Sequence, residues 1–139
     1  MDRAETINLL KQVPLFSSLS EKGLKAIIKV ATEKSFAQGT KIVGEGDLGV
    51  GFYLIVTGSA EVVRNDKQLA KLGSGAFFGE MSLLDGAPRS ADVIALEDTT
   101  CLILTTWVIK GLIAANPDVA MGMLKELSRR LREADRSLS

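Results

Sequence analysis

The sequence predicts an α+β domain, mainly β, in which an eight-stranded β-roll or jelly-roll barrel is flanked by N-terminal helices and a long C-terminal helix. Apolar residues recur at helical spacing near both ends of the 139-residue chain. Between these ends, ten of the 13 glycines lie from Gly39 to Gly86, at intervals suited to tight turns. About eight short strands in roughly seventy residues are typical of a compact barrel.

We expect residues 1–139 to form a single domain with three zones: N-terminal helices over 1–34, the β-roll over 35–106 and C-terminal helices over 107–139. In the first zone, Ile7 and Leu10 mark a short amphipathic helix. Ser20 is predicted to cap a second helix. The apolar residues of that helix recur at i, i+3, i+4 and i+7, which indicates one buried face: Leu24, Ile27, Ile28 and Ala31.

In the middle zone, residues 52–56 read as a buried strand because they form an uninterrupted apolar run. Residues 60–72 predict a hairpin that turns at the polar segment 65–67. The apolar runs 93–96 and 101–104 are predicted to make a second pair of strands.

The last helix has a clear start signal in Asn116-Pro117-Asp118, a cap residue followed by proline and an acid. Beyond it, small and apolar residues recur at alternating four- and three-residue steps, which is a heptad seam. This seam leaves two alternatives, a helix that lies on its own barrel and a helix that pairs with a second copy. The seam residues are Ala120, Leu124, Leu127, Leu131, Ala134 and Leu138.

Composition excludes several classes of function. The 17 basic and 17 acidic side chains cancel, so no field favours nucleic acid or a membrane surface, and no nucleic-acid partner is expected for this chain alone. The chain has no histidine, the commonest general base and metal ligand, so neither catalytic nor metal-binding residues are expected. The single cysteine, Cys101, lies in an apolar run and is expected to be buried and inert. No signal peptide or membrane span is apparent, which makes the cytoplasm the expected location.

Residues 77–92 carry the chemistry. Between Leu72 and Ile109, Arg89 is the only basic residue, and it lies among several acids. It could therefore pair with a neighbouring carboxylate, but Gly79 and Glu80 suggest a second interpretation. A glycine lets backbone approach a ligand, a carboxylate accepts from a hydroxyl, and a guanidinium forms paired hydrogen bonds to phosphate. Such a set suits a ligand with one negative charge beside a sugar hydroxyl.

This segment resembles the phosphate-binding cassette of the cyclic-nucleotide-binding domain family, whose pattern is roughly F-G-E-x-[AS]-L-L-x-x-x-P-R-[AST]-A. The family includes the sensor domains of bacterial catabolite activators and of protein kinase regulatory subunits. The resemblance covers nearly the whole chain, because residues 13–16, 36–47, 52–58 and 116–118 are similar to other family motifs. It implies a ligand sensor rather than an enzyme, with cyclic AMP (cAMP) or cyclic GMP (cGMP) as ligand, no cofactor, and a possible homodimer through the last helix.

The resemblance also implies a role for individual residues. The cyclic phosphate would be bound by Arg89, Ser90 and Ala91, and the ribose by Gly79, Glu80, Met81 and Ser82. The base would lie against an apolar wall from the roll, for which ordinary barrel core is the alternative: Val62, Leu69 and Ala70. The last helix would cover the base with Leu127, Arg130 and Leu131. Ligand binding would then be coupled to movement of that helix.

Two departures from the family pattern limit these expectations. Asp92 stands where a hydroxyl residue is common; it could face solvent, pair with Arg89, or point inward and weaken anion binding. Ala134 and Asp135 stand where the bacterial activators place hydroxyls that read adenine, so the preferred purine is left open. A degenerate family member that acts as a dimerisation scaffold is therefore an alternative. A metal-dependent barrel enzyme is a second one, disfavoured by the lack of histidine.

Overall fold

The computed structural model describes residues 3–13, 16, 19–46, 51–79 and 91–138. Within these ranges, eight strands form two four-stranded antiparallel sheets that face each other, which confirms the predicted β-roll with jelly-roll character. The first sheet has the order β1 (Thr32–Phe36), β8 (Thr99–Thr105), β3 (Gly51–Thr57) and β6 (Phe77–Phe78). The second has the order β2 (Lys41–Val43), β7 (Asp92–Ala95), β4 (Ala60–Arg64) and β5 (Lys67–Leu72).

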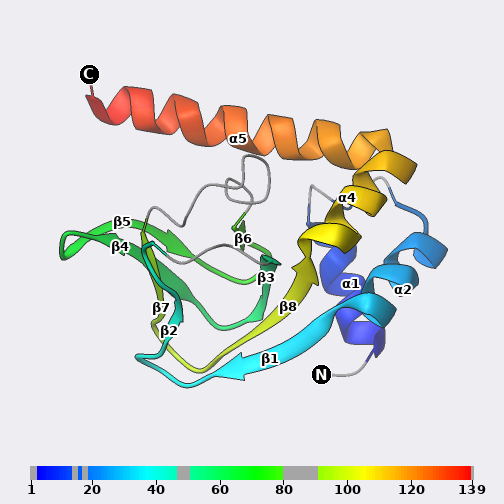
Figure 1. The fold of residues 1–139 in the computed structure, drawn as a ribbon, viewed down its shortest axis with the longest axis horizontal. Helices are drawn as coiled ribbons and strands as arrows, with labels where there is room; N and C mark the ends of the chain where they lie inside the picture. Colours follow the sequence, from blue (N-terminus) through cyan, green and yellow to red (C-terminus); the bar gives the residue numbers. More distant parts are fainter. Residues whose placement is uncertain (1–2, 14–15, 17–18, 47–50, 80–90, 139) are drawn as a thin grey trace.

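The helices lie where the sequence placed them. Helices α1 (Arg3–Gln12), α2 (Glu21–Val30) and α4 (Thr106–Ala115) gather at one end of the roll, and α5 (Pro117–Leu138) runs along one side of it (Figure 1). The predicted cap of α2 is present, because the Ser20 hydroxyl accepts from the amide of Gly23 at 3.2 Å. None of the helices in the described ranges has the length and apolar character needed to cross a membrane.

One buried cluster joins the helices to the first sheet, and its centre is a line of three aromatic rings. Phe16, just before α2, meets Phe52 of β3 edge-on at 6.4 Å between ring centroids. Phe52 stacks on Phe77 of β6 at 5.1 Å. Each such pair contributes about 0.5–1.5 kcal/mol beyond the burial of its surface. The line therefore connects the N-terminal region to β6 across the sheet.

A second buried cluster lies between the two sheets, and it includes the other residue of β6. Phe78 stacks on Tyr53 with 5.0 Å between ring centroids. Successive side chains of a strand point to opposite faces, so the two-residue strand β6 serves both clusters. Cys101 is fully buried in the second cluster, and burial raises the pKa of its thiol to about 11. The burial that the sequence predicted for this thiol is confirmed, and a raised pKa disfavours the reactive thiolate.

Two expectations about the strands need correction. The runs 93–96 and 101–104 do not pair with each other, because β7 pairs with β2 and β4 whereas β8 pairs with β1 and β3. Val93, Ala95 and Cys101 instead contribute to one core from opposite sheets, so the turn between β7 and β8 crosses from one sheet to the other. In addition, β1 begins at Thr32, before the expected boundary at residue 35. The sequence did not indicate this start because the first side chains of β1 are exposed and form no apolar pattern.

The crossing between the sheets is tied to the turn after β3. The Thr99 hydroxyl lies 3.2 Å from the amide of Ser59 and 2.8 Å from the carbonyl of Glu97. Gly58 lies directly beneath it with φ of 95°, and a Cβ there would come within 2.5 Å of the Thr99 Oγ1 and 2.6 Å of a backbone carbonyl. Only glycine combines this backbone conformation with such a close approach.

We expect Gly58→Ala to lower the free energy of unfolding by about 2–5 kcal/mol, since left-handed strain and overpacking add. Gly75→Ala is the matched control, because Gly75 has a similar φ of 89° with nothing within 4 Å of the added Cβ. That variant should lose only the strain, about 1–2 kcal/mol. Urea denaturation of both variants tests the difference, and equal losses would contradict the role of the Thr99 contact.

Candidate functional site

The structure describes only part of the predicted site. Its described members are Gly79 and Ala91 at the two ends of the cassette, the wall residues Val62, Leu69 and Ala70, and the helix residues Leu127, Arg130 and Leu131. Five predicted members lie outside the described residues, and their roles stay predictions: Glu80, Met81, Ser82, Arg89 and Ser90. The site is therefore built from its two fixed ends and from the elements that surround them.

The cassette begins at a rigid strand. Both residues of β6 are buried, with Phe77 in the first aromatic cluster and Phe78 in the second. Gly79 follows with φ of 96°, a conformation that side-chain-bearing residues rarely adopt. The chain is thus held on both faces up to Phe78 and then turns sharply at a residue without a Cβ, as an approach of backbone to a ligand requires.

The cassette ends on the second sheet, next to the predicted base wall. Ala91 is buried, and the next two residues pair with β4, Asp92 opposite Val63 and Val93 opposite Val62. Ala70 pairs with Val62 from the other side. The predicted phosphate residue Ala91 thus directly precedes β7, and the wall residues Val62 and Ala70 lie on the next two strands, β4 and β5.

The wall residues differ in burial. Val62 is half-buried and packs against the second cluster, whereas Leu69 is 51% exposed and Ala70 is also exposed. The alternative that all three are ordinary barrel core is therefore wrong for Leu69 and Ala70. An apolar side chain left open to solvent beside a predicted binding segment is available to an apolar ligand surface. Contact with a base stays a prediction.

The carboxylate of Asp92, which the sequence left with three possible orientations, is engaged with β2 and the turn after it. Its Oδ1 accepts from the amide of Glu45 at 2.7 Å, and its Oδ2 lies 3.5 Å from the Nζ of Lys41. The hydrogen bond from Glu45 lowers the pKa of Asp92, desolvation partly opposes it, and Lys41 lowers the pKa further. A lowered pKa adds stability above the ordinary carboxyl pKa, and this stability is lost as the pH falls through the folded-state value.

The last helix contacts the cassette strand through Arg130. Its Nη2 donates to the carbonyl of Phe77 at 2.8 Å, and its guanidinium lies over the Phe77 ring, 4.7 Å from the centroid. The sequence predicted a residue that covers the base and missed this contact. Phe77 lies 53 residues away and accepts through its main chain, so no sequence signal could have indicated it. Lys41 and Glu45 as partners of Asp92 were missed for the same reason.

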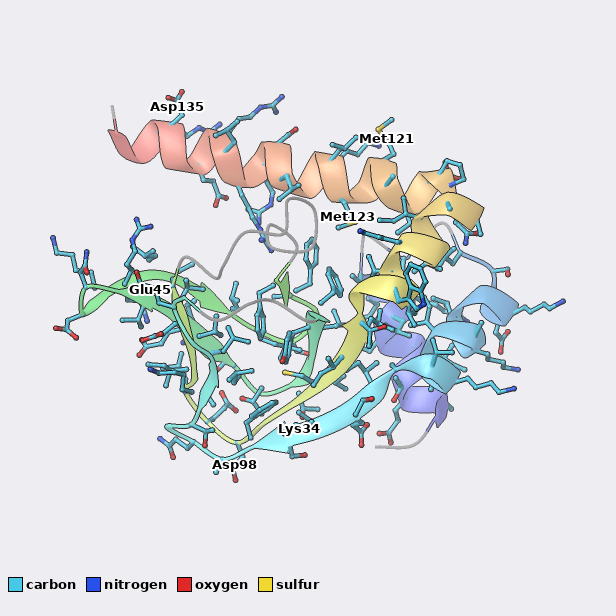
Figure 2. All side chains as sticks on the ribbon, in the orientation of Figure 1. Lys34, Glu45, Asp98, Met121, Met123 and Asp135 are labelled. Atoms are coloured by element: carbon cyan, nitrogen blue, oxygen red, sulfur yellow. The ribbon has the colours of Figure 1, made fainter. Side chains whose placement is uncertain are left out.

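The other predicted helix residues lie beside Arg130 with different exposure. Leu127 is half-buried, whereas Leu131 is 71% exposed. The face of α5 that packs on the protein is formed by Val119, Met123 and Arg130. Figure 2 shows Met123 pointing from α5 toward the body of the protein, and Met121 and Asp135 pointing away from it. Of the heptad seam, Leu124 and Leu131 are therefore exposed, whereas Leu127 is half-buried.

A separate hollow of about 470 Å³ lies at the ends of β1 and β3 and includes none of the predicted site residues. Three of its polar side chains have partners within the protein: Ser35 bonds Thr100, and Asp98 accepts from the amide of Gln38. These side chains are therefore already engaged and do not indicate a second ligand site. In the part of the chain that the structure describes, no group of three or more His, Cys, Asp or Glu side chains could hold a metal ion.

The described residues form two facing sheets, and the last helix is bonded to β6, where the predicted cassette begins before Gly79. These features define a β-roll ligand-binding domain. The chain belongs to the cyclic nucleotide-binding domain family, since the family's sequence model matches residues 33–116. The predicted resemblance is thus confirmed.

Individual relatives agree with this assignment. The chain is 39% identical over 134 residues to the cyclic AMP receptor protein of Thermus thermophilus, covering 93% of this chain and 62% of the relative. It is 41% identical over 91 residues to a cAMP-dependent protein kinase regulatory subunit of Hypocrea atroviridis, covering 66% of this chain and 20% of that subunit. A solved cyclic nucleotide-binding domain from Methylobacillus flagellatus has a TM-score of 0.82 and 30% identity, and 97% and 82% of the two chains are covered. The chain thus spans less than two thirds of the length of the first two relatives.

We expect Arg130→Met to loosen α5 from the roll. The variant keeps an apolar stem but loses the hydrogen bond to the Phe77 carbonyl and the contact with its ring, together worth about 2–4 kcal/mol when shielded and less at this half-buried position. Hydrogen exchange of the α5 amides should therefore be faster, and the free energy of unfolding should fall by about 1–2 kcal/mol.

Arg129→Met is the matched control for this variant. Arg129 is adjacent on the same helix, is exposed, and pairs with Glu133 at 2.6 Å, a contact worth about 0.3–0.5 kcal/mol. Equal changes in α5 exchange for the two variants would show that the Phe77 contact does not hold the helix.

Proposed function

We propose that this chain is a regulatory module that binds cAMP or cGMP and couples binding to the position of its C-terminal helix. The observation that carries the proposal is the bond from Arg130 of α5 to the Phe77 carbonyl, two residues before Gly79. This bond connects α5 directly to β6, the strand on which the predicted cassette begins. The chain is similar to a cyclic AMP receptor protein and to a cAMP-dependent protein kinase regulatory subunit, and these names support a cyclic nucleotide as the ligand class.

In this proposal, Arg89 binds the cyclic phosphate with Ser90 and the amide of Ala91, and Glu80 accepts from the ribose hydroxyl. Backbone groups of Gly79, Met81 and Ser82 complete the ribose and phosphate contacts. A guanidinium suits a phosphate because two parallel charge-assisted hydrogen bonds fix both its position and its orientation. The base lies against the wall of Val62, Leu69 and Ala70, covered by Leu127, Arg130 and Leu131 from α5.

The coupling is thermodynamic. A ligand shifts α5 only to the extent that it binds more tightly to one position of the helix than to the other. Micromolar affinity corresponds to about 8 kcal/mol of binding free energy, which suffices for a shift of a few kcal/mol. Arg130 is the described residue best placed to transmit the shift, because it contacts both the ring and the carbonyl of Phe77.

The alternative function, a dimerisation scaffold without nucleotide, has lost its main support. That support was Asp92, whose carboxylate would oppose an anion if it pointed into the site. Both oxygens of this carboxylate have partners in Glu45 and Lys41. We therefore favour the sensor. We further propose that it acts without a catalytic step and in the cytoplasm.

We also propose that two copies of the chain associate through α5. Leu124 and Leu131 of the heptad seam are 57% and 71% exposed, whereas Val119 and Met123 of the same helix are buried in the first cluster. Large apolar side chains repeated at heptad spacing on an exposed helix face fit the same face of a second helix.

Arg89→Ala tests the nucleotide site. We expect its affinity for the bound nucleotide to fall about 10–100-fold, since charge-assisted hydrogen bonds to the phosphate are lost, while the melting temperature without ligand stays within a few degrees. Calorimetric titration with cAMP and cGMP measures both affinities. Arg64→Ala, at the exposed end of the β4–β5 hairpin, is the control and should bind as the wild type does. An unchanged titration curve for Arg89→Ala would refute the site.

Leu124→Lys tests the association of two copies, because Leu124 belongs to the seam and has no proposed role in the nucleotide site. We expect it to convert a dimer to a monomer in sedimentation velocity, because a charge is then placed in the apolar seam. Met121→Lys is the control: Met121 is 54% exposed on the same helix but lies outside the seam. A wild type that sediments as a monomer, or two variants that behave alike, would contradict association through the seam.

A further inference from the structure

Asp92 occupies a position where a carboxylate needs explanation. It follows Arg89 by three residues, in a segment proposed to bind an anion, and its side chain is only 27% exposed. A negative charge at this position would oppose the binding of an anion unless the carboxylate is held by other groups. The contacts of Asp92 show which groups hold it.

The residue is held on both sides of its strand. β7 lies between β4 and β2, and the Asp92 backbone pairs with Val63 of β4. Its side chain reaches the other neighbour, where Oδ1 accepts from the amide of Glu45 just after β2. The pairing of β2 with β7 shifts register between Lys41 and Val43, as at a β-bulge. Figure 2 places Glu45 at the end of the roll away from α1 and α2.

We propose that Asp92 is a positioning residue, which anchors the exit of the cassette to the Glu45 amide and so fixes the place from which Arg89 reaches the phosphate. The inference rests on the proposed function. Lys41 has the secondary task of balancing the charge of the carboxylate.

The distance along the chain makes this anchoring effective. Three residues of extended chain span at most about 10 Å, so fixing Asp92 restricts the region in which the backbone of Arg89 can lie. Restricting a binding group before the ligand arrives removes part of the entropy that binding would otherwise cost. The carboxylate accepts from a backbone donor, so an isosteric amide can preserve the anchor without the charge.

The competing view is that Asp92 acts only as a negative charge near the anion, and the two views predict opposite signs. If its charge alone matters, both Asp92→Ala and Asp92→Asn bind nucleotide more tightly than the wild type, and Lys41→Met binds less tightly. If it positions the cassette, Asp92→Ala binds less tightly, and Asp92→Asn restores most of the affinity because its carbonyl oxygen still accepts from Glu45.

The experiment measures cAMP and cGMP affinities of these variants by calorimetry. We expect about tenfold weaker binding for Asp92→Ala, and binding within about threefold of the wild type for Asp92→Asn and for Lys41→Met, whose ion pair is partly exposed. Tighter binding by Asp92→Ala, or equal losses for Asp92→Ala and Asp92→Asn, would overturn the proposal.

A fourth variant removes the donor instead of the acceptor. Glu45 precedes Gly46, whose φ is 86°, the pattern of a type II turn in which proline is common at the first central position. Glu45→Pro therefore deletes the amide hydrogen while leaving Asp92 and Lys41 unchanged. We expect it to weaken binding about as much as Asp92→Ala does, and wild-type affinity in a folded Glu45→Pro protein would overturn the anchor even if Asp92→Ala fails to fold.

A second readout separates this inference from the proposed function. Hydrogen exchange of the Glu45 amide in nucleotide-free protein should be slow in the wild type and in Asp92→Asn, and fast in Asp92→Ala. If the wild type binds neither nucleotide, the proposed function fails, whereas the exchange result still reports on the anchor. Fast exchange at Glu45 in the wild type would overturn the anchor itself, whatever the affinity for nucleotide.

Discussion

The contact of the Arg130 guanidinium with Phe77 is the interaction on which the arrangement of the site depends. Phe77 ends the aromatic line that begins at Phe16 and passes through Phe52, so this single contact adds α5 to a row of packed groups that crosses the first sheet. A guanidinium that both donates to a carbonyl and covers a ring is held in orientation as well as in position. The last helix is thus attached to a buried residue of the core and not to a surface loop.

The two ends of the cassette are fixed by different interactions, ring stacking at the start and hydrogen bonding at the exit. At its start, β6 is held by ring stacking on both faces, through Phe77 and Phe78, and this hold depends on burial and not on charge. At its exit, Asp92 is held by backbone pairing and by a hydrogen bond to an ionised carboxylate. A segment fixed at both ends can offer binding groups to a ligand without first having to be ordered along its whole length.

Local sequence signals were sufficient to predict most of the helices and strands, whereas the roles of the cassette residues came from the family resemblance and stay predictions. The proline at residue 117, the Ser20 cap and the glycine spacing each act within a few residues, so their consequences could be predicted. The partnership of strands could not, because the apolar runs in β7 and β8 are equally compatible with a hairpin and with a crossing between sheets. The contacts of Asp92 and Arg130 join residues 47 and 53 positions apart, and neither has a sequence pattern.

Both of these long-range contacts join one side chain to one main-chain group: the Phe77 carbonyl in one case and the Glu45 amide in the other. A carbonyl is present whatever amino acid occupies its position, and an amide hydrogen is lost only to proline. A substitution at position 45 or 77 therefore leaves the hydrogen-bonding group in place, although at 77 it would also remove the ring that the Arg130 guanidinium covers. The side-chain partner of each hydrogen bond is a single residue, Asp92 or Arg130, so a lineage could change the exit of the cassette and the attachment of the helix independently.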